Sequence, residues 1–303
     1  MRAFRISAPA SSANLGAGFD AVGIAIEIRI TAEVRERAPG LANRWTYRGA
    51  HAPTHDGLRT CIEAGIAALA PSAPPLDVDL DNAIPLGAGL GSSAAAYAIG
   101  VAIGAQFAPA TIEDDVQARA VAALEGHPDN ALAAWYGGAV VAATGDDGLT
   151  SIRFPPPDVR AAVVVPSIVL PTAEARALLP QTYARADVVH NIQRAALLGA
   201  ALAAGRIDLL RAAVRDTLHQ PYRAAAIPGL REALALEDPA LAAVALSGAG
   251  PSVLALVFGD PRPVAARIAA CFERAGVAST VLTPALAASG VSMTLAEPAT
   301  GSA

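Results

Sequence analysis

The sequence predicts an α+β protein made of two packed domains. A chain of 303 residues, 53% of them hydrophobic, is long enough to bury a large core, and its length favours two domains over one. Segments that alternate apolar and polar residues, as strands do, lie between segments with helical spacing. Three prolines at 155–157 separate the two halves, so we place the domains at 1–155 and 156–303. Helices segregated from mostly antiparallel strands make an α+β protein, although these patterns alone do not separate it from an α/β arrangement.

Local patterns place the expected elements along the chain. Strands are expected at residues 5–8, 24–30, 76–80, 139–142, 161–165, 244–246, 253–258 and 279–282. Helices are expected at residues 59–70, directly after the glycine-rich segment 85–91, and at 112–124, 188–204, 208–218 and 264–275. We expect Thr111 to cap the helix at 112–124, and the pair His127-Pro128 to end it.

Composition excludes several classes of function. The net charge is −5 and the isoelectric point is near 5.5, which argues against a nucleic-acid-binding protein. Cys61 and Cys271 lie far apart and have no metal-ligand spacing, so we expect two buried thiols in a reducing compartment. The amino terminus lacks an apolar stretch typical of a signal peptide, and the most apolar run, residues 94–105, is shorter than the about 20 residues that span a bilayer. We therefore expect a cytoplasmic protein with a small-molecule substrate and no membrane partner.

Residues 85–96 read Pro-Leu-Gly-Ala-Gly-Leu-Gly-Ser-Ser-Ala-Ala-Ala, and they lie between an expected strand and an expected helix. Glycines let backbone N–H groups approach an anion, and the first turn of a helix offers unpaired donors at the positive end of its dipole. A Walker A loop needs a lysine, and the sequence contains none. The alternative is a Gly/Ser turn without a ligand. We predict a phosphate-binding loop made of Pro85, Leu86, Gly87, Ala88, Gly89, Leu90, Gly91, Ser92, Ser93, Ala94 and Ala95.

This loop resembles the second motif of the GHMP small-molecule kinases, Pro-x-Gly-x-Gly-Leu-Gly-Ser-Ser-Ala. Residues 9–20 resemble the opening motif of the homoserine kinases within that superfamily, with Ala17 where that family usually has proline. Residues 245–253 resemble the superfamily's carboxy-terminal glycine motif, and the resemblance extends over about residues 7–256. It implies an amino-terminal domain like the second domain of ribosomal protein S5, a ferredoxin-like carboxy-terminal domain, ATP and Mg²⁺ as cofactors, and a homodimer.

The resemblance also implies phosphorylation of the side-chain hydroxyl of L-homoserine, a step of threonine biosynthesis. Arg176 and Arg223 match the positions that hold the substrate carboxylate, as a bidentate guanidinium does well. The resemblance implies that Asn14, Asp20 and Asn130 bind the ammonium and hydroxyl ends of the substrate. We expect Thr172 to form a hydrogen bond with the reacting hydroxyl. We group Asn130, Thr172 and Arg176 as catalytic residues, and Ser93 and Glu125 match the magnesium-binding positions.

Three questions stay open from the sequence. Asp129 is either a general base or, as we favour, a residue that forms a turn or caps a helix. Residues 56–59 depart from the superfamily's adenine-pocket asparagine, so the adenine contacts are not assigned. The competing functions are a GHMP kinase for another alcohol, of the mevalonate or sugar type, and a catalytically silent protein that binds a ligand. Mevalonate kinases use a lysine in the first motif, which this chain lacks.

Overall fold

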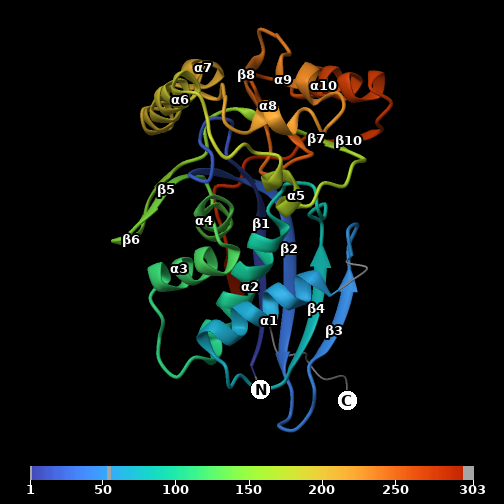
Figure 1. Ribbon diagram of the computed structural model, residues 1–303. Helices are drawn as coiled ribbons and strands as arrows, with labels where there is room; N and C mark the ends of the chain where they lie inside the picture. Colours follow the sequence, from blue (N-terminus) through green and yellow to red (C-terminus); the bar gives the residue numbers. More distant parts are fainter. Residues whose placement is uncertain (1, 53–55, 296–303) are drawn as a thin grey trace.

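The computed structural model describes residues 2–52 and 56–295, and it contains two β-sheets (Figure 1). The first sheet has seven strands, of which five follow the order β11-β1-β2-β4-β3, while β5 pairs with β2 and with β6. Only the β3–β4 pair is parallel. The strands are β1 (Ala3–Ala13), β2 (Val22–Glu36), β3 (Arg44–Arg48), β4 (Leu76–Asn82), β5 (Ala139–Gly145), β6 (Gly148–Phe154) and β11 (Ser292–Leu295).

Helices cover one face of this sheet (Figure 1). They are α1 (Gly57–Leu69), α2 (Ser92–Phe107), α3 (Asp114–Glu125) and α4 (Pro128–Tyr136). Helix α2 is apolar on nearly every side because it is surrounded by other elements, and most of its residues are buried. A Cβ atom on Gly100 would lie 2.2 Å from the carbonyl oxygen of Ile62, so glycine at this position lets α2 and α1 approach closely. This packing fixes the helix whose first turn belongs to the predicted phosphate loop.

The second sheet has the antiparallel order β10-β7-β9-β8 and carries a hydrophobic core on each face. In β7, Ala162 and Val164 face a core formed with α9 and α10, while Ala161 and Val163 join the main core shared with the first domain. The strands are β7 (Arg160–Pro166), β8 (Leu241–Leu246), β9 (Val253–Val257) and β10 (Ser279–Leu282). The helices are α5 (Thr172–Ala177), α6 (Arg185–Ala203), α7 (Leu210–Ala213), α8 (Gln220–Arg223), α9 (Leu230–Leu234) and α10 (Arg262–Arg274), with a 3₁₀ turn at Ile207–Leu209.

The last described strand returns to the first sheet. β11 pairs with β1 in antiparallel register, with Phe4 opposite Leu295, and Leu286 forms an isolated bridge to Ile26. The second sheet lies entirely after residue 155, so the division at 155 separates β7–β10 from the earlier strands, while β11 belongs to the first sheet by its hydrogen bonds. Domain boundaries drawn from the sequence stay a prediction. Within residues 2–52 and 56–295, no helix has the length and apolar character needed to cross a membrane.

The structure corrects three details of the sequence-based expectations. The helix expected at 112–124 begins at Asp114, so the prediction that Thr111 caps it was wrong; Glu113 is the non-helical residue before the helix, with φ −58° and ψ 144°. The helix ends at Glu125 and is followed by Gly126, whose φ of 86° suits glycine, so His127-Pro128 does not end it; Pro128 instead starts α4. The helix expected at 208–218 ends at Ala213 instead.

Candidate functional site

A pocket of about 110 Å³ lies where the glycine loops of the two halves meet. It contains every residue that the sequence analysis assigned to substrate or metal binding, although these residues come from distant parts of the chain. They are Asn14, Asp20, Ser93, Glu125, Asn130, Thr172, Arg176 and Arg223. The structure therefore brings together, in one cavity, the residues predicted to bind the substrate and those predicted to bind the metal ion. Their individual roles stay predictions.

The predicted phosphate loop runs from the end of β4 to the start of α2. Gly87, Gly89 and Gly91 all have positive φ, between 63° and 72°. A Cβ on Gly89 would lie 2.2 Å from the Ser247 carbonyl oxygen, so the loop packs directly against the carboxy-terminal glycine motif. Six of the predicted loop residues line the pocket: Gly87, Gly89, Leu90, Gly91, Ser92 and Ser93. The other five, Pro85, Leu86, Ala88, Ala94 and Ala95, are not part of its lining.

Ser93 and Glu125 are neighbours at this end of the pocket. The Ser93 hydroxyl donates a hydrogen bond of 2.8 Å to Glu125 Oε1, and burial raises the pKa of the Glu125 carboxyl above its ordinary value. Over the described residues, no group of three or more His, Cys, Asp and Glu side chains could hold a metal ion. One carboxylate and one hydroxyl nevertheless suit Mg²⁺, which takes oxygen ligands and keeps several waters and phosphate oxygens in its shell.

Arg176 and Asp20 form a bidentate ion pair at the acceptor end. Arg176 Nη1 and Nη2 donate to the two Asp20 carboxylate oxygens at 2.9 and 2.8 Å, and this pairing raises the pKa of Arg176. Both side chains remain about one-third exposed, which leaves the pair accessible from the pocket. The guanidinium also lies 5.5 Å from the centre of the Phe19 ring.

Arg223 is the most unusual charge in the molecule. It is 1% exposed, and no carboxylate among the described residues lies within ion-pair distance of it. Its Nη1 donates to the Gly248 carbonyl and to His219 Nδ1, both at 3.0 Å, and its guanidinium also packs against Phe19. Burial and the nearby Arg176 lower the pKa of Arg223 to about 10. A buried cation without a counter-ion favours the binding of an anion at this position.

His219 fixes the orientation of Arg223. The ring is fully buried, stacks on Phe19 with centroids 5.1 Å apart, and places Nε2 2.8 Å from the Gly16 carbonyl oxygen. A carbonyl only accepts, so Nε2 carries the proton and the free Nδ1 accepts from Arg223. Burial lowers the pKa of His219, which favours this neutral form.

Asn14 lies at the end of β1 and is nearly fully buried. Its amide donates to the Gly248 carbonyl at 2.9 Å and accepts from the Asp20 backbone N–H at 2.9 Å. Asn14, Leu15 and Asp20 are the described non-glycine residues with positive φ. A positive φ strains the backbone of a non-glycine residue, and such strain persists at functional sites where surrounding contacts stabilise it. Asn14 therefore sets the position of Asp20 and joins the opening motif to the carboxy-terminal glycine motif.

Asp129 lies in the first turn of α4 and lines the pocket together with His127 and Asn130. One of its oxygens, Oδ1, is 3.0 Å from His127 Nδ1 and also accepts the Asn130 backbone N–H at 2.8 Å. Asn130 Oδ1 accepts a hydrogen bond of 2.8 Å from the Ser11 hydroxyl. Both contacts of Asp129 fall on Oδ1, and Asp129 lines the pocket, so its role as a general base or as a structural residue stays a question for experiment.

Thr172 is the first residue of α5 and lies on the pocket lining beside Arg176. Three residues of the site were not found from the sequence: Ser11, Phe19 and His219. Phe19 had the clearest signal in the sequence, because it is an aromatic residue directly before Asp20, which was predicted to bind the substrate. His219 had none, because its contacts to Gly16 and Arg223 depend on the folding of distant segments.

Comparison with known proteins agrees with this site. Models of the GHMP kinases N terminal domain and the GHMP kinases C terminal match residues 58–138 and 198–278. A homoserine kinase of Solibacter usitatus is 40% identical over 97% of this chain and 98% of its own length. The chain belongs to the homoserine kinase family of GHMP kinases.

Two further similarities are consistent with that membership. A homoserine kinase of Deinococcus radiodurans is 42% identical and covers 86% of each chain. The crystal structure of homoserine kinase from Cytophaga hutchinsonii has a TM-score of 0.81 at 23% identity, covering 97% of this chain and 98% of that one, which shows the shared fold. The predicted two-domain GHMP kinase fold is thereby confirmed, and GHMP kinases use ATP as the phosphate donor.

Proposed function

We propose that this chain transfers the γ-phosphoryl group of ATP to the side-chain hydroxyl of L-homoserine, giving O-phospho-L-homoserine and ADP for threonine biosynthesis. The observation that carries the proposal is Arg223, a buried cation without a counter-ion in the pocket that also contains the glycine-rich loop. An acceptor with a carboxylate supplies the missing anion. Relatives about 40% identical over most of the chain are homoserine kinases, which supports the same substrate.

The acceptor end suits a zwitterion. The substrate carboxylate pairs with Arg176 and Arg223, and its ammonium pairs with Asp20, so one amino acid inserts between the two members of the Asp20–Arg176 ion pair without leaving either charge unpaired. Asn130 and Thr172 orient the hydroxyl at the mouth of the loop. A mevalonate acceptor has a carboxylate but no ammonium, so pairing it with Arg176 would leave Asp20 without its partner. A sugar acceptor has no carboxylate and would not supply the anion that Arg223 lacks.

At the donor end, backbone N–H groups of the loop and the first turn of α2 hold the nucleotide phosphates. Ser93 and Glu125 would hold Mg²⁺, which supplies charge neutralisation to the phosphates when it is bound. The acceptor hydroxyl oxygen attacks the γ-phosphorus as the bond to the bridging oxygen of ADP breaks, and the hydroxyl proton is released. Alignment of the reactants does most of this work. We assign no general base to this transfer.

A coupled ADP-release assay tests this proposal. With ATP and Mg²⁺ present, L-homoserine is compared at equal concentration with L-serine, mevalonate and galactose. Release with homoserine alone supports the proposal, and release only with another alcohol overturns the substrate. Arg223→Ala is expected to raise the KM for homoserine far more than the KM for ATP. We also propose that the protein acts in the cytoplasm as a homodimer, as the family resemblance implies.

A further inference from the structure

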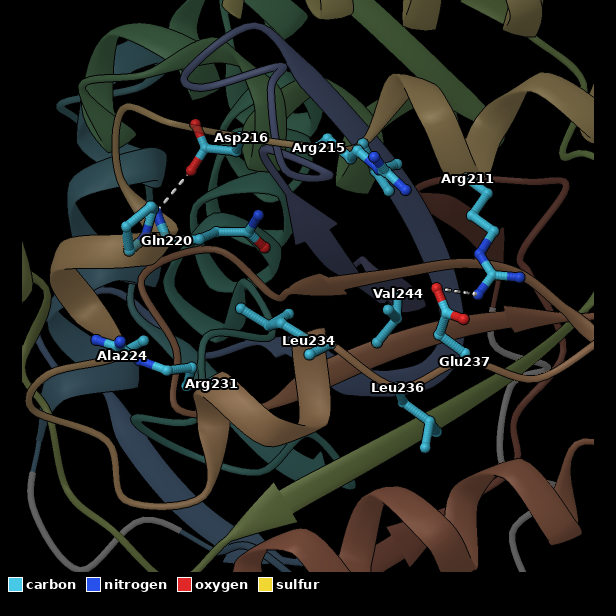
Figure 2. A pocket seen from close by; sticks show the side chains of 13 residues that line it. Arg211, Arg215, Asp216, Gln220, Ala224, Arg231, Leu234, Leu236, Glu237 and Val244 are labelled. Atoms are coloured by element: carbon cyan, nitrogen blue, oxygen red, sulfur yellow. Dashed lines mark hydrogen bonds and ion pairs between the residues drawn. The ribbon is translucent and has the colours of Figure 1, made fainter. Parts of the chain in front are cut away.

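A second and larger pocket lies in the carboxy-terminal domain (Figure 2). Gln220 and Pro221 of α8 line this pocket, whereas Arg223 of the same helix lines the predicted active site. Its volume is about 580 Å³, large enough for a small organic molecule, and it shares no lining residue with the active-site pocket. The residues that line it are Arg211, Val214, Arg215, Asp216, Gln220, Pro221, Ala224, Arg231, Leu234, Ala235, Leu236, Glu237 and Val244.

The polar part of this lining carries unpaired positive charge. Asp216 is buried and accepts the backbone N–H groups of Leu218, His219 and Gln220. Glu237 faces Arg211 at 3.8 Å, as the dashed line in Figure 2 shows. Both carboxylates are thus engaged within the protein. Within the described part of the chain, Arg215 and Arg231 are exposed and have neither an ion-pair partner nor a side-chain hydrogen bond.

The rest of the lining is mostly apolar. Four of these side chains are buried or half-buried: Val214 directly after α7, Leu234 on α9, Leu236 in the segment after α9, and Val244 on β8. A ligand that matches this lining has an apolar body and an anionic group, so that guanidinium groups at the rim pair with its charge. We propose that this pocket binds a small carboxylate with an apolar body, and that its occupancy changes the affinity for homoserine.

The coupling follows from the helix that separates the two pockets. Gln220 belongs to the lining, and its side-chain oxygen accepts the backbone N–H of Leu246 at 2.8 Å. Two residues further along, the Gly248 carbonyl accepts hydrogen bonds from Arg223 and Asn14 in the active site. A ligand that displaces Gln220 therefore acts on the segment that positions Arg223. Only this effect on homoserine rests on the proposed function, because binding itself does not require catalysis.

Asp216 provides a second connection between the pockets. It accepts the N–H groups that begin α8, and its Oδ2 lies 3.5 Å from His219 Nε2. His219 in turn accepts from Arg223 at 3.0 Å. The two connections converge on Arg223, so the coupling should affect the KM for homoserine.

The binding test uses the fluorescent anion 8-anilino-1-naphthalenesulfonate, titrated into full-length protein with homoserine and a non-hydrolysable ATP analogue filling the active site. We expect Arg215→Gln combined with Arg231→Gln to weaken binding about tenfold, since two guanidinium groups are lost. The matched control combines Arg5→Gln and Arg160→Gln, which removes two exposed arginines that have no ion-pair partner among residues 2–52 and 56–295 and lie outside this pocket. Equal weakening in both double variants, or none in the first, overturns the site.

Two further measurements define the ligand class and the coupling. Octanoate is expected to displace the probe from the wild-type protein, and Val244→Trp, which fills the pocket, is expected to abolish probe binding. Failure of either result overturns the proposal of an apolar carboxylate site. Octanoate should also shift the homoserine KM severalfold in the wild type but not in the double-arginine variant, and an unchanged KM refutes the coupling. A wild-type protein that binds the probe but does not phosphorylate homoserine refutes the proposed function and leaves the pocket assignment intact.

Discussion

His219→Phe isolates the hydrogen bonds that position Arg223. Phenylalanine keeps an aromatic ring against Phe19 but removes both ring nitrogens, so Arg223 Nη1 loses one of its two strong acceptors and the Gly16 carbonyl loses its donor. A hydrogen bond to a charged group contributes about 1.5–3 kcal/mol. If this loss appears in substrate binding, the KM for homoserine rises by about tenfold to a hundredfold, because each 1.4 kcal/mol is about a factor of ten.

Steady-state kinetics with each substrate varied in turn checks this expectation. The KM for ATP should stay within about twofold of the wild-type value, because the side chain of His219 contacts Gly16, Phe19 and Arg223, which lie outside the glycine-rich loop. A thermal melt of the variant serves as the control for folding. Equal increases in both KM values, or no increase in the homoserine KM in a folded variant, would falsify the positioning role.

The pH dependence gives an independent check of the same group. His219 is faced by Asp216, Arg223 and Asp20, and burial lowers its pKa below the ordinary value of 6.5. The neutral ring is the form that accepts from Arg223. Its contribution to stability is therefore complete above pH 6.5 and is lost as the pH falls through the lowered folded-state pKa. In the wild type, the homoserine KM should rise in that acidic range, and the rise should be absent in His219→Phe.

Three further changes have distinct expected outcomes. Gly89→Ala places a Cβ 2.2 Å from a backbone oxygen, so we expect the free energy of unfolding to fall by about 2–4 kcal/mol and ATP binding to weaken. Gly87→Ala has open space around its Cβ and should cost only about 1 kcal/mol. Equal melting temperatures of the two variants would contradict this difference. Glu125→Ala should lower turnover and raise the Mg²⁺ concentration needed for half-maximal rate, and an unchanged titration removes it from the metal site. The hydrogen bond to Asp129 raises the pKa of His127, so its stabilisation is present below pH 6.5 and disappears as the pH rises through the raised pKa. Asp129→Asn should therefore reduce the melting temperature more at pH 6 than at pH 9, and the same reduction at both values counts against the pair.

The sequence predicted the parts of the site that depend on local patterns. The glycine loop and the start of α2 follow from residues 85–96, since glycine spacing and helix formation are properties of one short segment. The resemblance placed Arg176 and Asp20 in one site, but their mutual ion pair joins segments 156 residues apart and had no local signal. The prediction for Arg223 as a carboxylate holder stays a prediction, and its lack of a counter-ion became visible only in the fold.

The elements that the sequence missed are short, polar or dependent on distant partners. β11 reads Ser-Met-Thr-Leu and is exposed along its length, so its strand character comes from pairing with β1 rather than from burial. Helix α4 was missed from the sequence because Pro128 was interpreted as the end of the preceding helix. Proline is also favoured in the first turn of a helix, and Pro128 is the first residue of α4. The expected helix at 208–218 was overextended because Asp216 takes the N–H groups that start α8.

The pairing of β11 with β1 has a consequence for the order in which the protein assembles during synthesis. A ribosome delivers residues 3–13 early and residues 292–295 late, so the outer edge of β1 has no strand partner while the rest of the chain is made. An open edge of this kind is a template for pairing with another molecule, and contacts between remote segments form slowly. Protection of the nascent sheet against self-association thus depends on a strand that contributes no residue to the predicted active site.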